Sequence, residues 1–392
     1  MKLFRTLSTP RLVALIAVIV ALAAGSAALA VAAIGSGGAT PPAKPLATAI
    51  HDALTGSAPD GITADITFTN TLFPSGALTG VTGSALMSGA TGRVWATNDG
   101  HGRLELQSSA GDVQIVWNAS ALSVYDASSN TVYKLALPAD STASGGSTSA
   151  STPPALSEIT TFLAKLSEHA TVPDAQPDNV GGQEAYTVSV SPKHDGGLLG
   201  SAQLSWDAAR GVPLRIAIYA QGSSSPALAL EVTHISYGAV QSSDVNVAPP
   251  TGAKVVDLSP NTKSDTGGTD PTGKQVTGVA AVQQAVSFPL SAPDTLVGLP
   301  RQDVTLVGSD SALAVYGQGL GAIIVSERKA DASTTSGGSL SSLPTVSLNG
   351  TSAHELATQL GTVVEWQHNG VAYVLAGSLP PAAAEAAARE LK

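Results

Sequence analysis

The sequence predicts an α+β fold: a half-open antiparallel β-barrel, or curved sheet, with covering helices, a smaller C-terminal α+β module and an N-terminal transmembrane helix. Three observations predict it. Apolar and polar residues alternate over many short segments, with turn residues about every 8–12 positions, which is typical of antiparallel sheets. Helical spacing is confined to a few segments. A long uncharged run near the start and a Pro/Gly/Asp-rich stretch past the middle divide the chain.

These divisions predict four parts. We expect a cytoplasmic tip and transmembrane anchor (or signal peptide) in residues 1–40, and a β domain in residues 41–258. An interdomain linker is expected in residues 259–278, and the α+β module in residues 279–392. The length of the chain is sufficient for two domains that each bury a core.

The first 34 residues predict export. Lys2, Arg5 and Arg11 precede Leu12–Ile34, which has 23 residues and no charge. A helix of this length extends about 34 Å and crosses a bilayer core of about 30 Å. The basic flank stays in the cytoplasm, so we expect a single-pass cell-membrane protein whose bulk is extracytoplasmic. Ala28-Leu29-Ala30 fits a cleavage site, so a cleaved signal and a secreted protein stay open as the alternative.

The composition excludes several partners. The chain has no cysteine, so neither a disulfide nor a lipid-modified N-terminal cysteine is expected. Three of the 19 basic residues precede the apolar run and all 29 acidic residues follow it, which leaves 16 against 29 and a net charge of −13 for the exported part. A surface this acidic repels nucleic acid and anionic headgroups. We therefore expect no nucleic acid partner.

Short strands dominate the predicted β domain. A short helix is expected at Pro45–Leu54, because Thr55-Gly56 ends it. From Gly61 the apolar residues alternate, which predicts a first strand. Further strands are expected at Arg93–Ala96, Arg103–Gln107, Val113–Trp117, Leu122–Tyr125, Thr131–Leu137, Glu184–Val190, Ala202–Trp206, Leu214–Ala220 and Ala227–Tyr237.

One amphipathic helix interrupts these strands. It is expected at Pro153–His169, because five apolar residues recur at helical spacing near one side: Leu156, Ile159, Phe162, Leu163 and Leu166. A tight hairpin turn is expected at Asp207–Gly211. In the module we expect helices near Val279–Val286, Ala353–Leu360 and Pro381–Leu391, and strands at Val304–Gly308, Leu313–Gly317, Ala322–Glu327, Thr362–His368 and Val371–Ala376.

Two glycine-rich segments resemble nucleotide-binding motifs without their context. Gly268–Lys274 approximates a phosphate-binding loop, but Gln275 replaces the Ser/Thr that holds magnesium, and a polar linker precedes it. Gly317–Ala322 follows a strand, but Ile323-Ile-Val continues as another strand, so no helix N-terminus is offered to a pyrophosphate. We expect a hairpin turn at Gly317–Ala322 and no nucleotide cofactor.

No other motif indicates catalysis or metal binding. The seven histidines are scattered, and no two have metal-ligand spacing. His194-Asp195 is followed by two glycines, which favours a solvated turn over a catalytic dyad. No Gly-x-Ser-x-Gly lies between a strand and a helix. The sequence therefore predicts a protein that is not an enzyme and holds no metal or cofactor, while a hydrolase with carboxylates on adjoining strands stays open as a third class.

The apolar positions of the β domain allow two interpretations. They can form an ordinary sheet core covered by the Pro153–His169 helix, or a partly filled concave face with this helix as a lid over an acyl chain. Each buried CH₂ of such a chain contributes about 0.8 kcal/mol. The residues expected to line this hydrophobic cavity are Phe68, Trp95, Leu104, Leu106, Ile115, Trp117, Tyr125, Tyr133, Phe162, Leu166, Trp206 and Ile216.

The order of several short motifs resembles a known family. The stretches are Gly92-Arg-Val-Trp95, Gly102-Arg-Leu-Glu-Leu106, Val113-Gln-Ile-Val-Trp117, Ser123-Val-Tyr-Asp126, Thr131-Val-Tyr-Lys134, Gly182-Gln-Glu-Ala-Tyr-Thr187, Leu204-Ser-Trp-Asp207 and Gly211-Val-Pro-Leu-Arg215. With them, Ala47–Leu258 resembles the lipoprotein-carrier (LolA/LolB) superfamily, which includes RseB-like periplasmic regulators. The module resembles, more loosely, the small domain that follows such domains in anchored bacterial proteins.

The resemblance implies a half-open barrel with an apolar cavity for acyl chains, and no catalysis. The first hypothesis is thus a membrane-anchored, extracytoplasmic protein that binds lipid or lipoprotein acyl chains. It is attached to the cytoplasmic membrane through Leu12–Ile34. The alternative is an envelope-stress or sigma-factor regulator of RseB type, whose protein partner docks on the C-terminal module.

Overall fold

The computed structural model describes residues 38–72, 85–136, 153–193, 197–257, 275–330 and 343–391. These residues fall into two compact units. The first lies within Met1–Thr71, Thr82–Lys193 and Gly200–Pro260, and the second within Leu72–Val81, His194–Leu199 and Asn261–Lys392. The predicted anchor lies outside the described residues. No helix in the described ranges has the length and apolarity that a membrane span requires.

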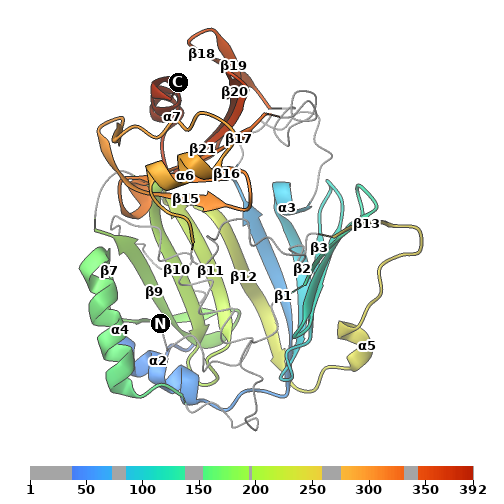
Figure 1. The fold of residues 1–392 in the computed structure, drawn as a ribbon. Coiled ribbons are helices and arrows are strands. Elements are labelled where there is room, and N and C mark those ends of the chain that lie inside the picture. The colour runs from blue at the N-terminus through green and yellow to red at the C-terminus, as the bar shows by residue number, and fades with distance from the viewer. Residues whose placement is uncertain are drawn as a thin grey trace, which may run out of the picture. The chain divides into compact units, whose positions relative to one another are not determined.

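A 13-stranded sheet forms the frame of the first unit (Figure 1). Its order is β13-β6-β5-β4-β3-β2-β1-β12-β11-β10-β9-β7, with β8 also paired to β9. The strands are β1 (Gly61–Asn70), β2 (Ala90–Thr97), β3 (Gly102–Gln107), β4 (Val113–Trp117), β5 (Ala121–Asp126), β6 (Thr131–Ala136), β7 (Ala170–Thr171), β8 (Gln176–Val180), β9 (Gln183–Pro192), β10 (Leu199–Asp207), β11 (Pro213–Ala220), β12 (Pro226–Tyr237) and β13 (Lys254–Asp257).

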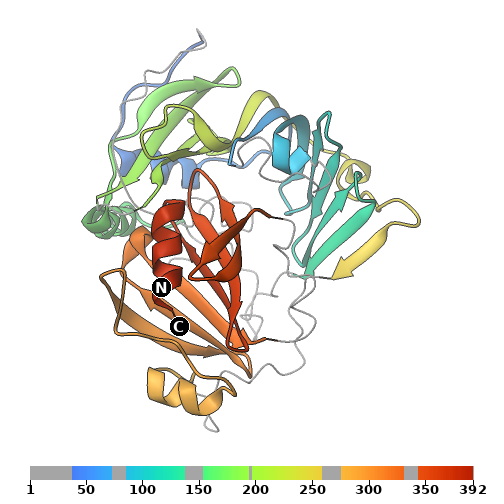
Figure 2. The same cartoon turned by 90° about the horizontal axis from the view of Figure 1, so that it is seen from above.

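Four helices accompany this sheet in the described part of the unit. They are α2 (Leu46–Thr55), α3 (Ala85–Ser88), α4 (Leu156–His169) and α5 (Ser242–Val245). The sheet curls into a half-barrel, as Figure 2 shows from above. The predicted α+β class with a curled sheet and few helices is therefore confirmed.

An irregularity in the ladder between β1 and β12 adds to the curl. The register shifts between Asp65 and Ile66, which leaves Thr233 of β12 without an opposite residue. The Thr233 hydroxyl donates a hydrogen bond to the Asp65 carbonyl at 3.2 Å. Such a bulge bends its strand and increases the local twist. The curl thus has a local cause near the centre of the sheet.

Besides the two-residue β7, two strands of the first unit were not predicted from the sequence. Strand β8 contains Pro177, Asp178 and Asn179, which are poor strand formers, and it exists because all five of its residues pair with β9. Strand β13 runs parallel to β6 and returns to it from far along the chain. Both strands are set by long-range pairing, which local composition does not reveal.

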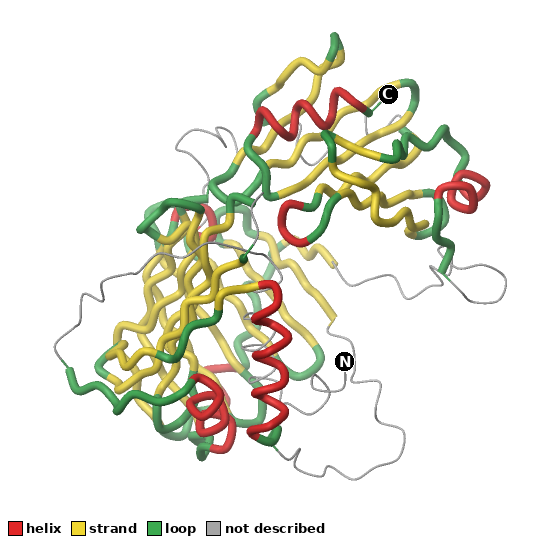
Figure 3. Tube along the Cα trace, turned by 90° about the vertical axis from the view of Figure 1, so that its left-hand side faces the viewer, coloured by secondary structure: helices red, strands yellow, loops and turns green. Residues whose placement is uncertain are grey.

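The second unit is an eight-stranded sheet of order β14-β15-β16-β17-β21-β20-β19-β18 with two α-helices in its described part. Its strands are β14 (Thr295–Leu296), β15 (Leu299–Val307), β16 (Ser311–Tyr316), β17 (Ile323–Lys329), β18 (Thr345–Leu348), β19 (Thr351–Ala357), β20 (Thr362–His368) and β21 (Val371–Gly377). Helices α6 (Val279–Ala285) and α7 (Pro381–Glu390) contribute to its core. Figure 3 shows strands and helices by colour.

The predicted helix at Ala353–Leu360 is wrong. Residues Thr351–Ala357 form β19, which pairs with β18 on one side and β20 on the other. Ala353 is buried opposite Trp366, whereas Leu356 lies opposite Val363 on the other face. The helical spacing of the apolar residues was incidental, because pairing on both sides outweighs a weak local propensity.

The core of the second unit contains a buried carboxyl group. Glu327 of β17 is 1% exposed, and its Oε2 accepts a hydrogen bond from the Ser291 N–H at 2.8 Å. Burial raises the pKa of Glu327 to about 7, and the Ser291 N–H offsets part of that rise. The charge of Glu327 in turn adds to the burial that raises the pKa of Tyr316 and of Tyr373, each to about 12.

The segment that Glu327 holds is tied down by other side chains as well. Gln283 donates to the Phe288 carbonyl at 3.0 Å and accepts from the Leu290 N–H at 2.9 Å. Arg301 pairs with Asp294 at 2.8 Å. The segment between α6 and β14 is therefore fixed by polar contacts, and the protonation of Glu327 affects one of them.

We predict that the second unit loses stability as the pH rises. The pKa of Glu327 is about 7 when folded and 4.5 in its ordinary state. Between these values the folded unit holds a proton that the unfolded chain has released, so stability is greatest below about pH 4.5 and falls up to about pH 7. The loss is on the order of 3 kcal/mol. Hydrogen exchange of β15–β17 amides, corrected for intrinsic rates, measures it in the full chain.

Glu327→Gln should remove this pH dependence. The matched control is Glu365→Gln, on the face of β20 that points away from the buried Trp366 and Val364. This control should keep the wild-type profile. A profile for E327Q that equals that of the wild type would contradict the assignment.

Candidate functional site

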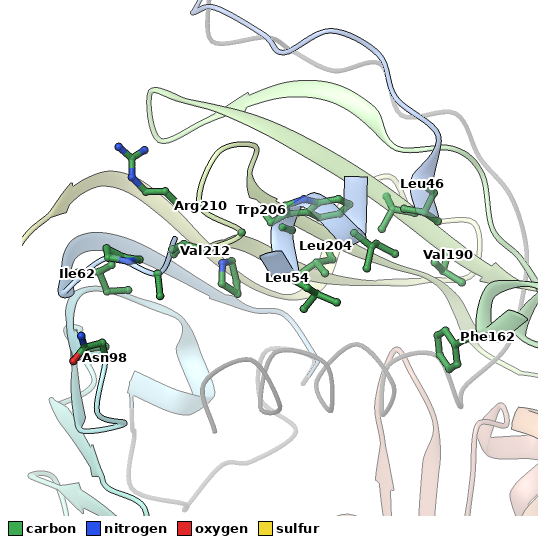
Figure 4. A pocket seen from close by; sticks show the side chains of 18 of the residues that line it. Leu46, Leu54, Ile62, Asn98, Phe162, Val190, Leu204, Trp206, Arg210 and Val212 are labelled. Atoms are coloured by element: carbon green, nitrogen blue, oxygen red, sulfur yellow. The ribbon is translucent and has the colours of Figure 1, made fainter. Parts of the chain in front are cut away.

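The first unit contains a pocket of about 450 Å³ between α2, α4 and the strands β9 and β10 (Figure 4). This volume is in the range of ligand pockets, which is roughly 300–1,000 Å³. Arg210 is the one charged residue among those that line it. The lining residues are Leu46, Ile50, Ala53, Leu54, Ala58, Pro59, Gly61, Ile62, Ala96, Thr97, Asn98, Phe162, Leu163, Leu166, Val172, Val188, Val190, Leu204, Trp206, Arg210, Gly211, Val212 and Pro213.

Helix α4 covers one side of the pocket. Phe162 and Leu163 are adjacent, and Leu166 follows about one helical turn later. The three side chains therefore share the face of α4 that lines the pocket. Leu156 of the same helix is 44% exposed and does not line the pocket, which corrects its expected place on the apolar side. The helix start is stabilised by Glu158, whose carboxylate accepts from the Ala155 N–H at 2.9 Å.

Helix α2 forms another wall and packs against α4. Its start is held by Asp174, whose Oδ1 accepts from the Leu46 N–H at 3.2 Å. The segment before it is held by Tyr186 of β9, whose hydroxyl donates to the Pro42 carbonyl at 2.6 Å. These long-range hydrogen bonds fix α2 against the strands that line the pocket.

Trp206 contributes the largest side chain of the strand wall. Its ring lies 6.1 Å from that of Tyr186 at an angle of 40°. The residue is 4% exposed, and its Nε1 has no hydrogen-bond partner within the described residues. Val188, Val190 and Leu204 complete this wall with aliphatic side chains.

The turn after β10 closes one end of the pocket and is organised by Asp207. This buried carboxylate accepts from the N–H groups of Ala209 and Arg210 at 2.8 and 2.7 Å. It also accepts from the Tyr237 hydroxyl at 2.5 Å. Burial and this hydrogen bond raise the pKa of Tyr237. The predicted hairpin turn at Asp207–Gly211 is confirmed, and Asp207 fixes its shape.

Gly211 brings the same turn against α2. Its φ is +66°, and a Cβ at this position would lie 2.3 Å from the Ala53 carbonyl oxygen. A left-handed backbone and so close an approach to another backbone both require glycine. The contact joins the turn to α2, so two walls of the pocket meet here.

Three of the twelve residues expected to line a cavity do line this pocket: Phe162, Leu166 and Trp206. Seven others share one face of the curled sheet, as the strand register shows. Four of them, Phe68, Leu104, Leu106 and Ile115, belong to or pack against a separate apolar cluster that includes Ile66 and Leu214. These seven are Phe68, Leu104, Leu106, Ile115, Trp117, Tyr133 and Ile216.

Trp95 and Tyr125 lie on the opposite face of the sheet, which corrects the expectation of one shared face. Trp95 pairs with Arg103, whose guanidinium lies 4.7 Å from its ring. Tyr125 pairs with Gln114, and its hydroxyl is 3.2 Å from Asn130 Oδ1. Alternation gives the period of a strand but not which face an aromatic residue takes. Ligand binding by the predicted residues stays a prediction.

Sequence reasoning missed the contribution of α2 to the pocket. Leu46, Ile50, Ala53 and Leu54 line it, although the helix itself was predicted. Their spacing on one helical face was the available signal. The turn residues from Arg210 to Pro213 had no local signal, because their place depends on the contact with α2.

The remaining motifs give no second site in the described residues. Within them, no group of three or more His, Asp or Glu side chains is placed to hold a metal ion. Gly317–Ala322 joins β16 to β17 as the predicted hairpin, with a 3₁₀ turn at Gly319–Gly321. Gly268–Lys274 and His194-Asp195 lie outside the described residues.

No family model and no curated protein matches the chain. Solved structures do resemble it. A Pseudomonas aeruginosa MucA/MucB complex gives a TM-score of 0.39 at 13% identity, over 87% of this chain and 96% of that one. A putative outer membrane lipoprotein-sorting domain from Vibrio parahaemolyticus gives 0.20 at 10%, over 51% and 94%. An uncharacterized conserved protein from Thermus thermophilus gives 0.32 at 11%, over 54% and 97%.

The solved structures similar to this chain thus include MucB in complex with MucA and a putative outer membrane lipoprotein-sorting domain. Because the identities are 14% or less and the TM-scores are low, these similarities assign no role to the residues that line the pocket. The geometry of the pocket itself therefore carries the functional proposal.

We predict that Gly211→Ala destabilises the first unit more than Gly222→Ala does. Both glycines have a left-handed φ, but nothing lies within 4 Å of a Cβ at Gly222. The control should cost about 1–2 kcal/mol from backbone conformation alone. Gly211→Ala must also displace the Ala53 carbonyl, so it should cost more. Urea unfolding of the full-length variants measures the difference, and equal losses would contradict a close contact with α2.

Proposed function

We propose that this protein is a non-catalytic binding protein that holds an acyl chain of a lipid or lipoprotein in the pocket beneath α4. The single observation that supports it is a pocket of about 450 Å³ with an almost wholly aliphatic and aromatic lining. Each CH₂ group transferred into such a lining contributes about 0.8 kcal/mol. A chain is therefore retained without a dedicated polar contact.

The lining favours an acyl chain over a polar ligand. Small polar ligands are recognised by several converging donors and acceptors. Here the polar side chains besides Trp206 are Thr97, Asn98 and Arg210. Most of the wall therefore offers dispersion and water exclusion only, which suits a methylene chain.

We further propose that the protein works outside the cytoplasm, attached to the cytoplasmic membrane. The support is the uncharged run Leu12–Ile34 behind three basic residues. A pocket for acyl chains is useful beside a membrane, where such chains are supplied and received.

Leu166→Asp should weaken binding of cis-parinaric acid by at least about tenfold, because it places a charge in the apolar lining. The matched control is Leu156→Asp on the exposed face of the same helix, which should bind like the wild type. A fluorescence titration of the full-length protein measures both affinities. Equal binding by L166D and L156D, with the fold retained, would show that the fatty acid does not enter this pocket.

A second function, binding of a protein partner, is favoured by β18 of the second unit. β18 is the last strand of its sheet in the described residues. The backbone N–H of Glu355 in β19 donates to the Pro344 carbonyl. The alternation of an antiparallel ladder therefore turns the N–H groups of Thr345 and Ser347 away from β19. An extended peptide is able to add to such an edge.

Thr345→Pro tests this second function, because it removes one outward N–H and leaves the ladder to β19 in place. It should weaken the complex with a protein that copurifies with the full chain, while binding of cis-parinaric acid stays unchanged. Calorimetry measures the affinity of the wild type and of T345P for that protein. An unchanged affinity excludes this edge as the docking site.

A further inference from the structure

The pocket has an apolar end and a polar end. Figure 4 places Phe162, Val190 and Leu46 at one end, and Arg210 and Asn98 at the other. Val190 and Leu46 are buried, whereas Arg210 and Asn98 are exposed. The polar side chains are thus at the rim, and polarity falls along the length of the pocket.

Neighbouring side chains hold the guanidinium of Arg210 in place but use few of its hydrogen-bond donors. It stacks over the Tyr237 ring with its carbon 4.2 Å from the centroid. Its one side-chain hydrogen bond within the described residues reaches Asp207 at 3.5 Å, the limit of such a contact. Asp207 already accepts from two backbone N–H groups and from Tyr237, all at 2.8 Å or less. A guanidinium has five donors, so most of those of Arg210 are free for a ligand.

We propose that the pocket takes a single-chain anionic amphiphile, with its carboxylate or phosphate at Arg210 and its chain directed towards Phe162. This inference rests on the proposed binding of acyl chains and adds the charge and the orientation of the ligand. A guanidinium stacked on a ring presents donors in a fixed plane, which suits the oxygens of a carboxylate or phosphate.

The net negative charge of the protein makes Arg210 important for the binding of an anionic ligand. The chain carries a net charge of −10, which repels an anionic ligand as it approaches. Arg210 is the one charged side chain in the lining, so it supplies the local attraction. It is 43% exposed on its side chain, so its contact with a headgroup is screened by salt.

Calorimetry with three ligands of one chain length tests the proposal on the full-length protein: dodecanoate, dodecyl phosphate and dodecanol, each below its aggregation limit. The wild type should bind the two anions about fivefold more tightly than the alcohol. Arg210→Gln should abolish this preference and leave the affinity for dodecanol unchanged, and Arg210→Lys should keep part of it. In 1 M NaCl the preference of the wild type should shrink.

The matched control is Arg93→Gln. Arg93 also lies near an aromatic ring, 5.9 Å from Trp95, and pairs with Asp65 at 2.7 Å, but it does not line the pocket. R93Q should keep the full preference for anions. A preference confined to dodecanoate assigns a free fatty acid, and one confined to dodecyl phosphate assigns a single-chain lipid that carries a phosphate; both support the proposal.

Two results overturn the inference in distinguishable ways. Equal affinities of the wild type for all three ligands, or an undiminished preference in R210Q, remove the role of Arg210 and leave acyl-chain binding standing. Failure of the wild type to bind any of the three overturns the proposed function itself. The salt dependence of the wild type needs no variant, so the test stands even if R210Q is unstable.

Discussion

The first unit depends on how a single curled sheet hides its apolar side chains from water. In the described residues, α2 and α4 are the only helices longer than one turn or so in this unit, and both gather at β9 and β10. They cover the strands without filling the space between. An apolar wall that stays in contact with water leaves about 25 cal/mol per Å² of burial free energy unrealised. An apolar ligand that excludes water from this wall would gain that free energy.

Asp207 fixes the shape of the turn that closes one end of the pocket. A buried carboxylate is costly unless it is hydrogen-bonded, and this one satisfies two backbone N–H groups and the Tyr237 hydroxyl. The same contacts shape the turn that carries Arg210 and Gly211. Asp207 therefore fixes the position of Arg210, the one charged residue of the lining, and the contact of Gly211 with α2. Glu327 in the second unit is different: one backbone N–H holds it, so burial dominates its pKa.

The sequence predicted local features well and long-range ones poorly. Val113–Trp117 and Thr362–His368 were predicted with the bounds that the structure has, because turns flank clear alternation. β13 was missed because its partner β6 lies far away in the sequence. β19 was misassigned although β18 and β20 are its neighbours in the chain, because the spacing of its apolar residues also fits a helix. The pocket follows the same rule. Phe162 and Trp206 were found, but the α2 wall and Arg210 come together only through tertiary contacts such as that of Gly211 with Ala53.

The unfilled space has an origin in composition. Only 4% of the residues are aromatic, with five Phe and four Trp in 392 positions. The elements that enclose the pocket place Ala53, Ala58 and Ala96 where larger side chains would close it. Protein interiors otherwise pack like organic crystals, with few voids larger than a water molecule. Small side chains in a frame that the Asp207 turn and the Tyr186–Pro42 hydrogen bond fix therefore leave a hollow that the protein's own side chains do not fill.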